Sequence, residues 1–269
     1  MRTLVHLSDL HFGDVDAAIL EPLSGIIRSL GPDVVVVSGD LTQRARPGQF
    51  REARAFLDAL PGHKIVVPGN HDIPLVNLWA RFATPLERFR AGISSDLEPS
   101  YTDDEIAVMG FNSARAGKWK SGRLNDAQLA RARERLAVLP ASLVKVVVTH
   151  HPFDVPPGGR ERDVLGRARP AMAVFAAAGA DLFLSGHLHV GHTAPTVDRY
   201  PLNDRSALVI HAGTATSNRQ RGERNSFNVL RLEGGRLGVV RFEFDPEGGA
   251  FLPRPEERYE RGSRGWQAA

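Results

Sequence analysis

The stretch RTLVHLSDLH (residues 2–11) is an apolar run that closes on an aspartate and a histidine. The pattern returns four times along the chain, as DVVVVSGD (33–40), KIVVPGNHD (64–72), LVKVVVTHHP (143–152) and DLFLSGHLH (181–189). Apolar runs of about four to eight residues, rich in valine and isoleucine, are typical of strands buried on both faces. The carboxyl ends of such strands share one rim of the sheet, where ligands gather in α/β folds. The sequence therefore predicts an α/β fold whose polar strand ends meet at a single site.

The polar residues at these strand ends are of the types that hold two divalent cations side by side. They comprise carboxylates, imidazoles and one amide, in the blocks Asp9-Leu10-His11, Gly39-Asp40, Gly69-Asn70-His71-Asp72, His150-His151-Pro152 and Gly186-His187-Leu188-His189. Two cations about 3.5–4 Å apart can clamp the attacking and leaving oxygens of a phosphoryl displacement. Imidazole and carboxylate ligands suit Mn, Fe, Zn or Co, and the chain has no cysteine that would select among these metals.

Each block taken alone has a simpler interpretation. A single aspartate after a strand is usually a cap, and Gly-Asp and Gly-Asn are ordinary turn dipeptides. A single buried histidine is usually satisfied by a backbone carbonyl. All of these interpretations would have to hold at once on one rim, which favours the metal site.

In order and spelling, the five blocks resemble the calcineurin-like metallophosphoesterase superfamily, whose pattern runs D-x-H, G-D, G-N-H-[DE], H-x-P and G-H-x-H. The resemblance extends from residue 1 to about residue 215. It implies a four-layer α/β/β/α sandwich of two mixed β-sheets flanked by helices. It also implies individual roles: one metal held by Asp9, His11 and His189, a second held by Asn70, His150 and His187, Asp40 bridging both, and His71 as a general acid held in place by Asp72. In the H-x-P block the first histidine is the ligand, so His151 lies outside this set.

A second passage narrows the resemblance. Asn112-Ser113 follows the apolar run IAVMG (106–110), and Gly122-Arg123-Leu124 and Gln128-Leu129 come later. This passage is similar to one in class III cyclic-nucleotide phosphodiesterases, although Asn112 stands where aspartate is common. The resemblance implies a dinuclear metal-dependent phosphodiesterase that hydrolyses small phosphodiesters, with cyclic nucleotides as candidate substrates, by attack of a metal-bound hydroxide. Two alternatives stay open: a nucleotide or lipid-linked pyrophosphatase or phosphomonoesterase of the same superfamily, and a non-catalytic metal-binding scaffold.

Composition and charge fit a cytoplasmic enzyme, which is the location we expect. The 269 residues are 42% hydrophobic, enough for a substantial core, and no cysteine is present for disulfides or thiol chemistry. The first strand is expected from about residue 2, which leaves no room for a signal peptide, and no apolar run approaches the length of a membrane span. The formal net charge is only +3, without a basic and aromatic surface pattern. We therefore expect a small anionic phosphodiester as partner, no nucleic-acid polymer and no membrane span.

The remaining pattern predicts helices between the strands and a strand-rich end. Helical apolar spacing covers residues 16–30, 48–60, 125–139 and 169–179, and further strands are expected at 206–213, 226–233 and 236–244, the last two joined by a hairpin at Gly234-Gly235. We expect one domain over residues 1–245, with a small cap-like insertion at about 73–100. The C-terminal tail, 246–269, is expected to be a poorly ordered end or a surface wrap. Loops 73–100, 153–170 and 213–226 should surround the rim and shape the substrate site.

Overall fold

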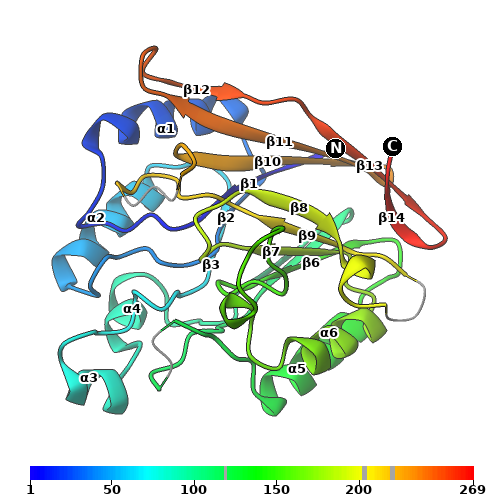
Figure 1. Ribbon diagram of the computed structural model, residues 1–269, viewed down its shortest axis with the longest axis horizontal. Coiled ribbons are helices and arrows are strands. Elements are labelled where there is room, and N and C mark those ends of the chain that lie inside the picture. Colours follow the sequence, from blue (N-terminus) through cyan, green and yellow to red (C-terminus); the bar gives the residue numbers. More distant parts are fainter. Residues whose placement is uncertain (118–119, 202–204, 219–221) are drawn as a thin grey trace.

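Two β-sheets lie face to face, with helices on both outer faces (Figure 1). The computed structural model describes residues 1–117, 120–201, 205–218 and 222–269. The helices in this part of the chain are α1 (Ala17–Leu30), α2 (Pro47–Asp58), α3 (Leu78–Ala83), α4 (Glu87–Gly92), α5 (Asp126–Ala137) and α6 (Ala168–Ala177), with 3₁₀ turns at Glu161–Asp163 and Thr196–Asp198.

The first sheet is built around three parallel strands from the first third of the chain. Its strands run in the order β14-β13-β11-β10-β1-β2-β3, and β12 pairs with β11. Their bounds are β1 (Arg2–Leu7), β2 (Val34–Val37), β3 (His63–Val66), β10 (Ser226–Glu233), β11 (Arg236–Asp245), β12 (Ala250–Pro253), β13 (Glu257–Gly262) and β14 (Gly265–Ala268). Strands β1, β2 and β3 are parallel, whereas β10 joins β1 in antiparallel register, so the sheet is mixed.

The second sheet has a parallel centre and antiparallel edges. Its order is β4-β5-β6-β7-β9-β8. The strands are β4 (Ser100–Thr102), β5 (Ile106–Gly110), β6 (Val144–Val148), β7 (Leu182–Ser185), β8 (His192–Pro195) and β9 (Leu208–His211). Strands β5, β6, β7 and β9 are parallel, so the carboxyl ends of β6 and β7 lie on one rim.

The continuous apolar runs arise because each central strand is covered on both faces. In β2, Val34 and Val36 pack into the core between the two sheets, whereas Val35 and Val37 pack into the core under the helices of the first sheet. A third core lies between the second sheet and helices α5 and α6. These three cores separate four layers, and the predicted α/β/β/α sandwich of two mixed sheets is confirmed.

The expected helix boundaries follow from capping chemistry. The Asp16 carboxylate accepts a hydrogen bond from the Ala18 amide at 3.0 Å, and Gly31 ends α1 in the left-handed conformation. Asn125 and Gln128 form a reciprocal capping box at the start of α5. The four predicted helices are therefore confirmed within one or two residues, and so is the hairpin after Glu233, which pairs with Arg236.

Of the two expectations for the C-terminal tail, a poorly ordered end or a surface wrap, the first is wrong. Residues from Ala250 onward form β12, β13 and β14, which extend the first sheet, and Trp266 is buried in the core between the sheets. The polar composition misled the prediction because β13 is mostly exposed and lies near the sheet edge. Backbone hydrogen bonds, which no side-chain pattern reports, hold such a strand in place. The division of the domain at residue 245 stays a prediction.

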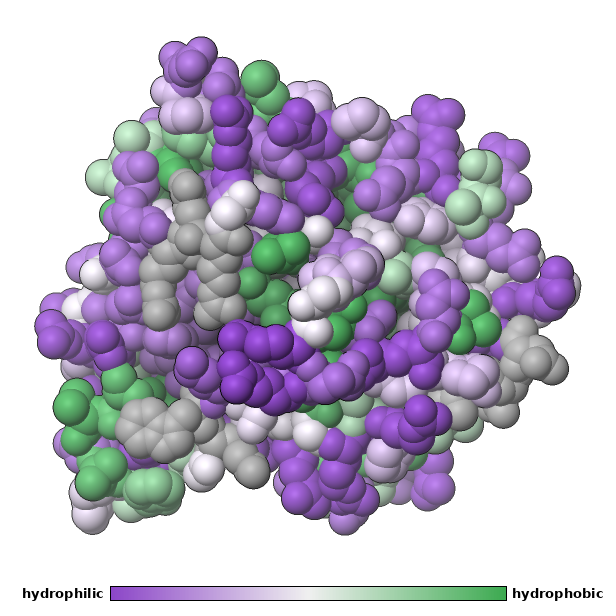
Figure 2. All heavy atoms as spheres, in the orientation of Figure 1, coloured by the Kyte–Doolittle hydropathy of each residue, from purple (hydrophilic) through white to green (hydrophobic). Residues whose placement is uncertain are grey.

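The segment 73–100 contains α3 and α4 and exposes apolar side chains around α3. Val76, Leu78, Trp79 and Phe82 are all strongly exposed. Figure 2 shows hydrophobic residues gathered at the corner of the molecule where α3 lies. Its role as a cap stays a prediction. In the third rim loop, 213–226, residues 219–221 lie outside the described part of the chain.

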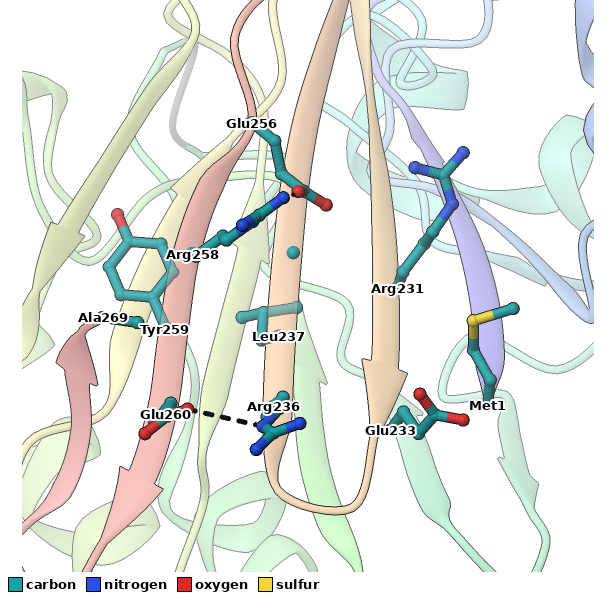
Figure 3. Close-up of a pocket in the computed structure, with 11 residues that line it drawn as sticks. Met1, Arg231, Glu233, Arg236, Leu237, Glu256, Arg258, Tyr259, Glu260 and Ala269 are labelled. Carbon is teal, nitrogen blue, oxygen red and sulfur yellow. Dashed lines mark hydrogen bonds and ion pairs between the residues drawn. The ribbon is translucent and has the colours of Figure 1, made fainter.

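A hollow of about 530 Å³ lies on the first sheet, over strands β10, β11 and β13. Its lining is mixed in charge, and Figure 3 shows the Arg236–Glu260 ion pair, 3.4 Å long, that crosses between β11 and β13. This hollow shares no residue with the predicted site, so the site is located by its chemistry rather than by the size of a cavity. No helix in the described ranges is both long and apolar enough to pass through a bilayer.

Candidate metal centre

Backbone hydrogen bonds between the loops that follow β1, β2 and β7 bring the strand ends together. The Asp9 amide donates to the Gly39 carbonyl at 3.1 Å, and the His11 amide donates to the Asp40 carbonyl at 2.9 Å. From the second sheet, the His187 amide donates to Asp9 Oδ2 at 2.9 Å. Residues far apart in the sequence are therefore held in one place by the backbone before any ligand is considered.

The backbone of this centre is strained. Seven non-glycine residues of the described chain have a positive φ, and five of them are predicted ligands: Asp9, His11, Asp40, His187 and His189, with φ between 49° and 71°. The left-handed region costs an L-residue roughly 1–2 kcal/mol. Such strain persists where the surroundings impose it, and it is concentrated at functional sites.

Two glycines give the ligands room. A Cβ on Gly39, whose φ is +95°, would lie 2.7 Å from His150 Nδ1, and a Cβ on Gly186 would lie 2.5 Å from Asp9 Oδ2. Both distances are too short for any side chain. The glycines of the G-D and G-H-x-H blocks are therefore required by close packing.

Asp9, His11 and His189 form one group of converging ligand atoms. Their ligand atoms all lie within 4.8 Å of one another, and all three residues are buried. The Nε2 atoms of His11 and His189 face each other at 3.4 Å, and they lie 3.6 and 3.2 Å from Asp9 Oδ1. Asp9 Oδ1 makes no hydrogen bond within the described residues. A buried carboxylate oxygen beside two imidazole nitrogens fits a divalent cation, because it supplies lone pairs with no competing donor.

His150, Asn70 and Asp40 meet on the other side of the centre. His150 Nε2 lies 3.1 Å from the Asn70 side-chain oxygen and 3.4 Å from Asp40 Oδ2. The ring of His187 lies 5.1 Å from that of His150. Asp40 Oδ2 also lies 3.7 Å from His11 Nε2, so this carboxylate stands between the two groups.

The members of the centre differ in how far solvent reaches them. Asp9, His11, Asp40, His150 and His189 are buried. The half-buried members are Asn70, His71 and His187. The amide and these two imidazoles are therefore the groups of the centre that a substrate can reach from solvent.

Electrostatics keep the carboxylates ionised. Burial alone would raise the pKa of Asp9, but the imidazoles of His189 and His11 outweigh it and hold that pKa well below its usual range. For His150, burial would lower the pKa, but the Asp40 carboxylate raises it to about 9. Burial and the nearby Asp40 charge raise the pKa of Asp72 to about 6. Burial would raise the pKa of Asp40 too, but the imidazoles of His150 and His71 lower it below its usual range. The centre therefore carries fixed negative charge at Asp9 and Asp40.

His71 and Asp72 lie at the centre, and the hydrogen bonds described for their side chains lead to different partners. The Asp72 carboxylate accepts hydrogen bonds from the amides of Leu41, Thr42 and Gly69 and from the Thr42 hydroxyl. It therefore fixes the turn rather than the imidazole. His71 Nδ1 instead lies 3.0 Å from the Gln43 carbonyl oxygen, which orients the ring.

Sequence reasoning missed three residues that hold the imidazoles. The Ser38 carbonyl accepts from His150 Nδ1 at 2.8 Å, Gln43 serves His71 in the same way, and the Ser113 hydroxyl lies 2.9 Å from His151 Nδ1. Ser38 and Gln43 act through backbone carbonyls, which every residue carries, so no sequence signal could have found them. Ser113, in contrast, belongs to the Asn112-Ser113 passage, whose resemblance to class III cyclic-nucleotide phosphodiesterases had already singled it out.

Comparison with known proteins agrees with this geometry. The family described as calcineurin-like phosphoesterase matches residues 2–191, more than half of the chain. The chain belongs to the calcineurin-like phosphoesterase family. The match covers every predicted ligand, and the resemblance seen in the sequence is confirmed.

Several curated proteins are similar over most of the chain. A probable cyclic nucleotide phosphodiesterase of Rhodococcus erythropolis is 29% identical over 71% of this chain and 66% of its own length. A glycerophosphodiester phosphodiesterase, GpdQ, of Enterobacter lignolyticus is 30% identical over 60% of each chain. A cAMP/cGMP dual specificity phosphodiesterase of Mycobacterium tuberculosis is 28% identical over 72% of this chain and 64% of its own length. The matched part of the chain thus spans about two-thirds or less of these relatives.

Solved structures with the same fold include two phosphatases. The purple acid phosphatase PPD1 of yellow lupin has a TM-score of 0.72 at 12% identity, covering 98% of this chain and 54% of its own. A dimetal phosphatase of Danio rerio has a TM-score of 0.66 at 14% identity, covering 94% of this chain and 98% of its own. At such low identity these likenesses concern the fold alone.

Proposed function

We propose that this phosphoesterase-family chain is a dinuclear metal-dependent phosphodiesterase. The observation that carries the proposal is the position of Asp40, whose Oδ2 lies 3.7 Å from His11 Nε2 and 3.4 Å from His150 Nε2. A carboxylate between two sets of converging ligands is the arrangement that two adjacent cations require. In this proposal the first cation is held by Asp9, His11 and His189, the second by Asn70, His150 and His187, and Asp40 bridges both.

The ligand set suits Mn, Fe, Zn or Co, because it combines imidazole with carboxylate and amide oxygens. Cations held by these residues would supply Lewis acidity, which lowers the pKa of a water towards neutrality and offsets the charge of a phosphate. The chain's own contribution is to fix the ligands on a strained backbone, so that little reorganisation is needed when charge develops.

His71 has the position of a general acid. It is half-buried, and its ring lies 4.9 Å from that of His11, edge-on. The Gln43 carbonyl accepts a proton held at Nδ1 and thereby orients the ring. In this proposal Nε2 is the nitrogen that exchanges a proton with the leaving group. Asp40 Oδ1 accepts the His71 amide at 2.8 Å, which ties the position of the acid to the proposed bridging carboxylate.

Diesters are the proposed substrates. The curated relatives at 28–30% identity carry the names of cyclic nucleotide and glycerophosphodiester phosphodiesterases. A diester carries one negative charge where a monoester dianion carries two, so it meets less repulsion from a nucleophile held at a site with Asp9 and Asp40 already ionised. Small phosphodiesters, cyclic nucleotides among them, therefore fit best, and the cytoplasmic location expected from the sequence stays a prediction.

Turnover by the reconstituted protein tests this function. The metal-free protein is loaded with Mn, Fe, Zn or Co and assayed on bis-nitrophenyl phosphate, nitrophenyl phosphate, cyclic nucleotides, glycerophosphodiesters and nucleotide pyrophosphates. We expect metal-dependent hydrolysis that favours diesters, and its loss in Asp40→Asn, which keeps the side-chain shape but removes the charge. A monoester or pyrophosphate rate well above every diester rate would favour the other hydrolases of the superfamily. Full metal binding without turnover of any substrate would favour a scaffold.

A further inference from the structure

His151 adds a third imidazole to the second half of the centre. It follows His150 at the end of β6, is fully buried, and its ring lies 4.9 Å from the ring of His150 and 4.7 Å from that of His187. One nitrogen from each of these three rings lies within 4.8 Å of the others. By distance alone, His151 therefore resembles a further metal ligand.

The hydrogen bonds of Ser113 decide which nitrogen of His151 carries the proton. The Ser113 hydroxyl oxygen accepts the His151 backbone amide at 3.2 Å and lies 2.9 Å from His151 Nδ1. Both residues are fully buried, and within the described ranges the hydroxyl contacts no other acceptor. A hydroxyl has one proton, and buried donors are almost always satisfied. The hydroxyl proton therefore goes to Nδ1, which has to be unprotonated to accept it.

The proton of the neutral ring then sits on Nε2, and this separates His151 from its neighbours. His150 Nδ1 faces the carbonyl of Ser38 at 2.8 Å, and a carbonyl can only accept, so Nδ1 keeps its proton and Nε2 is the nitrogen that His150 can deprotonate to bind a metal. His151 has the opposite tautomer. Its Nε2 offers a hydrogen rather than a lone pair, and this buried atom has no hydrogen-bond partner among the residues that the structure describes.

The second sequence passage forms the cradle of this ring. The Ser113 carbonyl accepts from the Arg123 amide at 2.9 Å, which fixes the serine. A Cβ on Gly122 would lie 2.2 Å from His151 Nδ1 and 2.7 Å from the Ser113 carbonyl oxygen, so only glycine fits against the ring. The Asn112-Ser113 and Gly122-Arg123 dipeptides thus both contact His151, and together they fix the orientation of its imidazole.

We propose that His151 is a hydrogen-bond donor that binds an oxygen of a phosphate group at the second site, and that it is not a third metal ligand. The inference rests on the proposed function, and it assigns the donor that recognises the phosphate. Ser113 is a positioning residue in this arrangement, because it acts only through the tautomer of His151.

Metal content and phosphate binding test the proposal without turnover. His151→Ala should retain the metal content of the wild-type protein, whereas His150→Ala should lose one metal. Titration of the zinc-loaded protein with inorganic phosphate should show roughly ten- to hundredfold weaker binding in His151→Ala, the range for a lost hydrogen bond to a charged group. His151→Gln, which keeps an N–H donor, should recover part of the affinity, and His63→Ala, at an exposed histidine of β3, should match the wild type.

The tautomer can be observed directly. In the ¹⁵N-histidine spectrum of the metal-free and zinc-loaded protein, His151 should be protonated at Nε2 and bare at Nδ1. Ser113→Ala should release the ring to the other tautomer, and Ser113→Thr, which keeps the hydroxyl, should restore it. A protonated Nδ1 in the wild type, loss of a metal in His151→Ala, or unchanged phosphate affinity would each overturn the proposal. The spectrum of the wild type and Ser113→Thr decides it even if His151→Ala does not fold. Because none of these readouts uses a substrate, they remain valid if diester hydrolysis is not found.

Discussion

Gly69 is a position where a single methyl group should damage the proposed centre. It follows β3 in the G-N-H-[DE] block, directly beside the loop that carries Asp40. A Cβ placed on Gly69 would lie 2.1 Å from Asp40 Oδ1 and 2.3 Å from the Asp40 backbone nitrogen. Ordinary contacts are about 3.5–4.0 Å long, so the two loops would have to separate by more than 1 Å. The Asp40 side chain cannot avoid the clash by rotating, because the backbone nitrogen is blocked as well.

The expected cost of Gly69→Ala has two parts. Overpacking of this kind lowers the free energy of unfolding by about 1–3 kcal/mol, and for a chain of this size each kcal/mol corresponds to roughly 2–4 °C in Tm. A shift of about 1 Å in a group that positions the reaction costs roughly 100-fold in rate. The variant should therefore melt several degrees lower, bind less metal and hydrolyse diesters far more slowly.

Gly25→Ala is the matched control. Gly25 lies inside α1, and an added Cβ there would meet nothing within 4 Å. The same substitution should raise stability by about 0.5–1 kcal/mol, because alanine favours the helix, and it should leave metal content unchanged. Calorimetric Tm, metal per chain and the diester rate are measured on both variants. A Gly69→Ala protein with the Tm and metal content of the wild type would refute the steric argument.

Three further outcomes are expected. Asp40→Ala should lower the occupancy of both metal sites, whereas Asn70→Ala should lower mainly that of the second site. Elemental analysis of both variants measures this, and two metals retained per chain in Asp40→Ala would exclude the bridging role. His71→Ala should keep its metals, and its rate of hydrolysis should fall roughly 10²–10⁴-fold for substrates with alkyl or nucleoside leaving groups but much less for those that release nitrophenolate. Equal losses of rate on both kinds of substrate would indicate that His71 positions the substrate. Burial lowers the pKa of His211 to about 3, below the usual 6.5 of the unfolded chain, so its contribution to stability is complete above pH 6.5 and falls as the pH drops towards 3. When the pH falls from 7.5 to 5, the free energy of unfolding, measured by chemical denaturation, should drop by about 2 kcal/mol more in the wild type than in His211→Gln. Parallel curves of unfolding free energy against pH for the two proteins would contradict this.

The sequence by itself determined the layers and the place of the site. Runs such as VVVV in β2 are apolar at every position because both faces of the strand are covered, and this is visible without any structure. The residue types at the strand ends also marked the rim, since parallel strands place their carboxyl ends together. Helix ends were predictable where a side chain does the capping, as Asp16 and Asn125 do.

Tertiary structure alone decided how the imidazoles are held and what the end of the chain does. The Gln43 carbonyl, not Asp72, orients His71, because backbone carbonyls have no sequence signature and their partners depend on how two loops approach. The tautomer of His151 depends on Ser113, a residue 38 positions away. The polar segment after residue 250 became three strands because an exposed strand near a sheet edge needs backbone pairing rather than apolar side chains. In each case the deciding contact joins backbone or hydroxyl groups distant in the chain, and only the folded arrangement specifies it.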